Sequence, residues 1–162
     1  MRRRTFVGIC LWLPWVARAA GPEPLLRGPG LRDLCPVCGM VVAKYPNWVA
    51  SVAWKGGQVH FFDGAKDLFK YLFDLPRYAP GRRREEITGI TVTEYYDLRR
   101  IDARQAWFVI GSDVHGPMGH ELIPFASQAD ADEFLRDHGG RRILRFADVK
   151  ADLPVRLDQG QF

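Results

Sequence analysis

Sulfur and imidazole side chains are scarce in this sequence, whose 162 residues include three cysteines, three methionines and four histidines. The sequence also has no glycine-rich phosphate loop, no Ser/His/Asp constellation and no Gly-x-Ser-x-Gly elbow. Its carboxylates show no pair placed for acid–base chemistry. These absences argue against the common hydrolase and nucleotide-binding classes, and they draw attention to the few sulfur atoms present.

Apolar runs long enough to cross a membrane comfortably are missing as well. The main apolar run, residues 6–16, follows three arginines and precedes Ala17-Arg18-Ala19. This layout predicts a signal peptide over residues 1–20, of the Sec or twin-arginine type, with an uncleaved anchor as the alternative. Cys10 would leave with the signal, and its context is not a convincing lipobox, so the sequence does not favour lipid anchoring.

Charge of one sign is not in excess once the signal is removed. Residues 1–20 hold four of the 23 Lys and Arg residues and none of the 19 Asp and Glu residues, which leaves 19 of each. A neutral mature chain gives no reason to expect a nucleic-acid partner.

The remaining sequence predicts one domain of two similar halves. A Pro/Gly-rich linker over residues 21–31 precedes a domain over 32–150, and a polar, frayed tail over 151–162 follows it. The halves span about 35–88 and 90–150, and a shift of 63 residues superposes Phe62 on Phe125 and Asp67 on Asp130. This weak repeat would put the two methionine-containing segments described below in equivalent places.

Each half reads as strands, a capped helix and a further strand, which is an α+β pattern. In the first half we expect strands over residues 41–43, 48–54 and 59–62 and a helix over 64–74, with Asp63 as its N-cap. In the second half we expect strands over 91–96, 106–110 and 143–146 and a helix from Ser127, its N-cap, to about Asp137.

Two short segments hold the sulfur atoms of the mature chain. The first is Cys35-Pro36-Val37-Cys38-Gly39-Met40, and the second is Gly116-Pro117-Met118-Gly119-His120. Thiolates and thioethers are the ligands that select Cu(I), whereas thioethers suit zinc, calcium and magnesium poorly. The sequence therefore predicts a Cu(I) site drawn from Cys35, Cys38, Met40, Met118 and His120.

Three other readings of Cys35 and Cys38 stay open. A thiol–disulfide oxidoreductase would place the first cysteine at a helix N-terminus, but Gly39 and the valines after it favour a turn and a strand. A Cys₂His₂ zinc site with His115 and His120 has acceptable local spacings but leaves both methionines without a role. A structural disulfide needs only an oxidising compartment.

Three segments together resemble the NosL family, the accessory proteins of nitrous-oxide reductase. They are residues 35–48 (CPVCGMVVAKYPNW), 61–67 (FFDGAKD) and 111–125 (GSDVHGPMGHELIPF). The resemblance implies a periplasmic copper chaperone that is not an enzyme and that folds as two similar ββαβ halves. It further implies Cu(I) delivery, with a membrane ABC-type complex, for assembly of the copper-sulfide centre of nitrous-oxide reductase.

Carried onto this chain, the resemblance points to Cys38 as thiolate and Met118 as thioether, with Cys35, Met40 or His120 completing a low-coordinate, partly exposed site. Many members of the family have a single cysteine before Gly-Met, so Cys35 is either an extra ligand or a disulfide partner. Many are also lipoproteins. The sequence leaves open whether two molecules form a homodimer that shares one ion.

Overall fold

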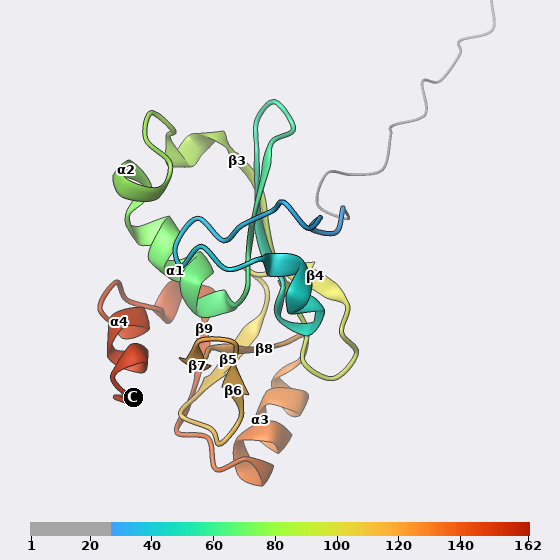
Figure 1. Ribbon diagram of the computed structural model, residues 1–162. Helices are drawn as coiled ribbons and strands as arrows, with labels where there is room; N and C mark the ends of the chain where they lie inside the picture. The colour runs from blue at the N-terminus through green and yellow to red at the C-terminus, as the bar shows by residue number, and fades with distance from the viewer. Residues whose placement is uncertain (1–26) are drawn as a thin grey trace, which may run out of the picture.

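The computed structural model describes residues 27–162, and Figure 1 shows them as two sheets accompanied by helices. The predicted signal peptide and most of the predicted linker lie outside the described residues. Within residues 27–162, no helix has the length and apolar character needed to cross a membrane.

The first half forms a four-stranded antiparallel sheet in the order β2-β1-β3-β4. Gly56 and Gly57, at φ 94° and 86°, allow the tight turn between β1 and β2, because the left-handed region favours glycine. The elements of this half are β1 (Ala50–Trp54), β2 (Val59–Phe62), α1 (Ala65–Phe73), α2 (Leu75–Tyr78), β3 (Ile87–Thr93) and β4 (Arg100–Asp102).

The second half repeats the pattern with a three-stranded antiparallel sheet in the order β8-β5-β9. A separate two-stranded hairpin, β6–β7, is inserted between β5 and β8. The elements are β5 (Trp107–Ile110), β6 (His115–Gly116), β7 (Gly119–His120), β8 (Ile123–Phe125), α3 (Gln128–Asp137), β9 (Arg142–Arg145) and α4 (Leu153–Asp158). In both halves the first strand is central, so the predicted α+β fold of two ββαβ halves is confirmed.

The two halves share one main hydrophobic core. The ring of Phe69 in α1 packs on Phe108 in β5, with centroids 5.4 Å apart. Buried residues of both sheets belong to the same cluster, whereas Phe125 and Phe134 anchor a smaller cluster under α3. The halves therefore form one unit through shared burial of apolar surface.

Three local expectations are wrong. The strand predicted at 41–43 is a single bridge between Leu34 and Val41 followed by a 3-10 turn at Val42–Lys44. The tail predicted to be frayed contains α4, which buries Leu153 and Leu157 against the core. The two methionine segments are not equivalent in the repeat, because the first precedes β1, whereas the second follows β5 and belongs to the β6–β7 hairpin.

The predicted cap of α1 is also wrong. The N-cap is Gly64 and makes no side-chain cap bond, whereas the Ser127 side chain caps α3 as expected by accepting a hydrogen bond from the Asp130 N–H. The Asp63 carboxylate is thereby free for a different contact, described next.

Candidate metal site

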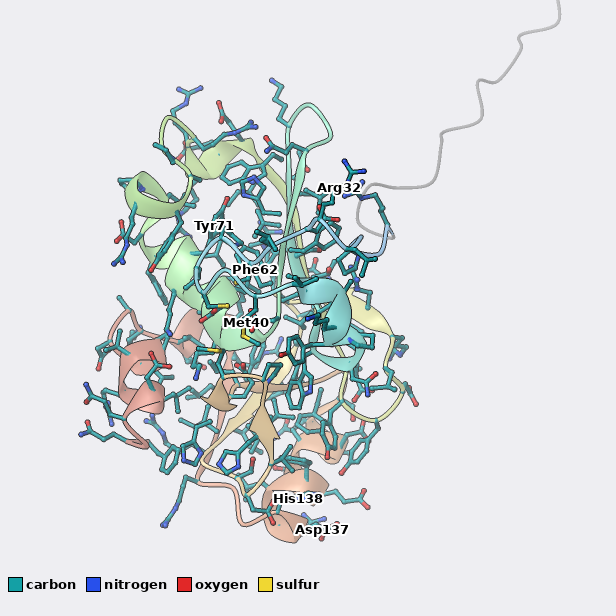
Figure 2. The ribbon with its side chains drawn as sticks, in the orientation of Figure 1. Arg32, Met40, Phe62, Tyr71, Asp137 and His138 are labelled. Carbon is teal, nitrogen blue, oxygen red and sulfur yellow. The ribbon has the colours of Figure 1, made fainter. Side chains whose placement is uncertain are left out.

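A tight turn presents the two thiols side by side. The Cys35 N–H donates to the Met40 carbonyl at 2.8 Å, and the Gly39 N–H donates to the Cys35 carbonyl at 2.8 Å. Gly39 has φ 79°, which a residue with a side chain adopts only with strain. Met40 is labelled in Figure 2 and enters the turn through its backbone. The spacing Cys-x-x-Cys-Gly-Met is thus a turn and not the start of a helix.

Two carboxylates of the β2–α1 corner face these thiols. The Cys38 thiol donates to Asp63 Oδ1 at 3.2 Å, and the Cys35 thiol donates to Asp67 Oδ2 at 3.4 Å. Asp63 directly precedes the N-cap of α1 and Asp67 lies in its first turn, so both carboxylates sit at the start of this helix. One ligand atom from each of the four residues lies within 4.8 Å of all the others.

Burial sets the protonation of the thiols. Burial, together with the neighbouring Asp63 and Asp67 and against the opposing bond from the Met40 backbone, raises the pKa of Cys38 to about 12. Burial, followed by the charges of Asp63 and Asp67, also holds the pKa of Cys35 far above its usual range. Both cysteines are free thiols and not a disulfide. Coordination of a metal by these sulfurs must therefore release protons.

The two carboxylates lie directly against the thiol groups. Asp63 and Asp67 already accept the two S–H groups. The second oxygen of Asp63 is buried and has no hydrogen-bond partner among residues 27–162. A buried carboxylate oxygen without a partner is costly, and a cation at this place would satisfy it.

The second sulfur segment forms the β6–β7 hairpin. Met118 lies in its turn with 41% of its surface exposed. His115 and His120 pair across the two strands with ring centroids 4.5 Å apart, and the His120 ring also packs against Phe162. Burial, followed by the charges of His115 and Lys66, lowers the pKa of His120. This shift favours the neutral imidazole, which is the form that binds metal.

Both sulfur segments approach the start of α1. The Lys66 ammonium donates to the Met118 carbonyl at 2.6 Å, while Asp63, three residues earlier, accepts from Cys38. Figure 1 shows the hairpin below the first turn of α1 and the N-terminal loop passing across it. Met118 and His120 are thus held at the same end of α1 as the two thiols.

The structure groups the predicted residues differently from a Cys₂His₂ site. Among residues 27–162, the one group of three or more His, Cys, Asp or Glu ligand atoms close enough to hold an ion is Cys35, Cys38, Asp63 and Asp67. His115 and His120 do not belong to it. The sequence interpretation missed the two aspartates because Asp63 was read as a helix cap. Their spacing of four residues after a buried strand was the available signal.

Comparison with known proteins gives the family. The NosL family model matches residues 30–154, which is most of the chain. The chain belongs to the NosL family. It is 33% identical over 118 residues to a copper-binding lipoprotein NosL from Stutzerimonas stutzeri, and the match covers 72% of this chain and 62% of that relative.

A solved structure supports the same assignment. The crystal structure of the copper chaperone NosL from Shewanella denitrificans superposes with a TM-score of 0.62 at 27% identity, covering 80% of this chain and 98% of that one. Both relatives are named for copper and not for a reaction, in agreement with the expectation that this NosL protein is not an enzyme.

Proposed function

We propose that this NosL protein is an exported Cu(I) chaperone that supplies copper for assembly of the copper-sulfide centre of nitrous-oxide reductase. Copper binding is supported above all by the pair of free thiols held against two carboxylates, close to a hairpin that offers a thioether and an imidazole. Copper is the cargo here. The delivery to nitrous-oxide reductase, with a membrane ABC-type complex and the apo-enzyme as partners, follows from the resemblance to the NosL family, and the name of the Shewanella relative, a copper chaperone, supports hand-over of copper.

The donor types suit Cu(I). Sulfur and imidazole ligands match a soft monovalent ion, and carboxylate oxygens suit harder ions. We therefore assign the ion to Cys35, Cys38 and Met118, with His120 or Met40 as further donors. Asp63 and Asp67 accept the S–H groups of the metal-free protein.

The proposed ligands differ in their exposure to solvent, and this difference favours hand-over of the ion. Cys35 is 2% exposed, Cys38 is half-buried, and Met118 stands at the surface. A partner can approach the ion from the Met118 side and replace the thioether first. A site enclosed on every side would store the ion instead.

The raised thiol pKa values count against the oxidoreductase reading. A catalytic dithiol needs a thiolate near neutral pH, which is usually produced by a helix N-terminus or a nearby cation. In this protein burial and two aspartates act in the opposite direction.

Anaerobic Cu(I) titration against a chromophoric chelator tests the proposal. We expect Cys38→Ser to weaken Cu(I) binding by about 100-fold and Met118→Ala by about 10-fold, since both remove a ligand. Leu31→Ala, which also shortens an exposed apolar side chain but removes no sulfur, should leave the affinity unchanged. Equal affinities for the wild type, Cys38→Ser and Met118→Ala would overturn the proposal.

A further inference from the structure

Lys66 is a lysine whose side chain is almost completely buried. Its ammonium lies 2.8 Å from Asp158 Oδ1 of α4, and the side chain is 1% exposed. Lysine is rarely buried to this extent unless its charge is paired and its N–H groups have acceptors. The second acceptor is the backbone carbonyl of Met118, at 2.6 Å.

The same residue holds the hairpin at a second point. The Lys66 backbone N–H donates to Glu121 Oε1 at 2.5 Å, and Glu121 directly follows β7. The close approach depends on Gly64, because a Cβ at that position would lie 2.1 Å from Glu121 Oε2. Lys66 thus binds both ends of the segment that carries Met118 and His120.

Ion pairs connect Lys66 to the two thiols. Asp158 also pairs with Lys70 at 2.6 Å, and Lys70 pairs with Asp67 at 3.3 Å. Asp67 in turn accepts the Cys35 thiol at 3.4 Å. One polar network, between α1 and α4, therefore touches both sulfur segments.

We propose that Lys66 is a positioning residue for copper binding, which fixes the Met118 turn relative to the thiol pair. The proposal rests on the function proposed above. Met118 lies on an exposed two-residue turn that has little packing of its own. Without the Lys66 contacts, the turn would have to be ordered when copper binds, and the conformational entropy lost would weaken binding. A turn that is already held in place avoids this cost. Lys66 itself does not touch the ion.

A double-mutant cycle separates positioning from general stability. Lys66→Leu, which adds no new sulfur, should weaken Cu(I) binding by about 10-fold, a typical effect for a residue that orients a ligand. In a Met118→Ala background the same change should have no further effect on affinity. The loss in thermal midpoint should be the same in both backgrounds. An equal loss of affinity in both backgrounds, or none in either, would overturn the proposal.

Hydrogen exchange of the metal-free protein supplies a readout that is independent of copper. The amides of the β6–β7 hairpin should exchange faster in Lys66→Leu than in the wild type. Thr93→Val is the matched control, because it removes a buried hydrogen bond, from the Thr93 hydroxyl to the Val49 carbonyl, outside the hairpin. It should change neither hairpin exchange nor copper affinity. Unchanged hairpin exchange in Lys66→Leu would contradict the proposal.

Two further comparisons complete the test. Lys66→Gln is a milder variant, because it places no apolar side chain beside Asp158, and it replaces Lys66→Leu if that variant does not fold. It should show the same coupling to Met118. Absence of Cu(I) binding by the wild type would overturn the proposed function together with the role of Lys66. Copper binding with additive effects would overturn the role of Lys66 alone.

Discussion

Glu121 is a fully buried carboxyl group next to the proposed site. Burial raises its pKa to about 8, although the Leu122 N–H and the charge and backbone of Lys66 act in the opposite direction. Between its ordinary pKa and this value, the folded protein keeps a proton that the unfolded chain releases. The contribution of Glu121 to stability is therefore complete in acid and is lost as the pH rises toward 8.

Glu121→Gln should remove this pH dependence. The amide oxygen can still accept from the backbone N–H groups of Lys66 and Leu122, so the fold is kept. We expect the wild type to lose stability between pH 5 and 8 by up to about 1.4 kcal/mol per pH unit relative to the variant. Urea unfolding at several pH values measures this difference. Glu133→Gln, on an exposed part of α3, should follow the wild type. A Glu121→Gln slope equal to that of the wild type would contradict the assignment.

Sequence reasoning located the sulfur atoms of the candidate site but not the carboxylates beside the two thiols. Cys35 and Cys38 are only three positions apart in sequence, so their proximity followed from the spacing alone. Asp63 is 25 residues away from Cys38, and an aspartate before a helix is usually a cap. Only the packing of the cysteine turn on α1 shows that this carboxylate serves the thiol.

The start of α1 depends on a close approach that a larger side chain would block. Gly64 has φ −174°, an extended conformation open to any residue, so an effect of substitution there is steric. Gly64→Ala would place a Cβ 2.1 Å from Glu121 Oε2, and Glu121 is held by two backbone N–H groups and cannot move away freely.

Gly64→Ala should therefore lower the free energy of unfolding by about 1–3 kcal/mol, as overpacking does elsewhere. Urea denaturation measures the change. Gly28→Ala is the control, because no atom lies within 4 Å of its Cβ position, and it should stay within about 0.5 kcal/mol of the wild type. Equal stability of the two variants would show that Glu121 relaxes without cost.

Elements with clear periodicity were predicted well. The strand at Val59–Phe62 and the helix at Gln128–Asp137 lie where the sequence placed them. The error at residues 41–43 has a physical cause. The two valines there favour a strand, but Val41 pairs only with Leu34, and Val42 is buried in the main core within a 3-10 turn. Tertiary packing decided this segment, and the sequence pattern could not show it.

The repeat is visible at the scale of the whole molecule. The starts of α1 and α3, at Ala65 and Gln128, differ by the predicted 63 residues. The central strands β1 and β5 begin 57 residues apart, because the β6–β7 hairpin is inserted only in the second half. The insertion carries Met118 and His120, so the asymmetry between the halves is also what supplies the second set of donors.

Helix α4 joins the two halves, although the sequence predicted a frayed tail. It follows the second half in the chain and packs on α1 of the first half and on β7 (Figure 1). Leu157 is fully buried in the shared core, whereas Val155 on the same helix is 51% exposed. The polar composition of the segment hid the leucine at position 157, whose burial depends on contacts distant in sequence.

Leu157→Ala should lower the free energy of unfolding by about 2–5 kcal/mol, because it removes a buried leucine and leaves a cavity. Val155→Ala should cost less than about 0.5 kcal/mol. Since α4 links both halves, we expect the Leu157→Ala protein to unfold in a single transition at a lower urea concentration, by fluorescence and by circular dichroism alike. Two separate transitions, with only one of them shifted, would mean that the halves are independently stable and that α4 stabilises just one of them.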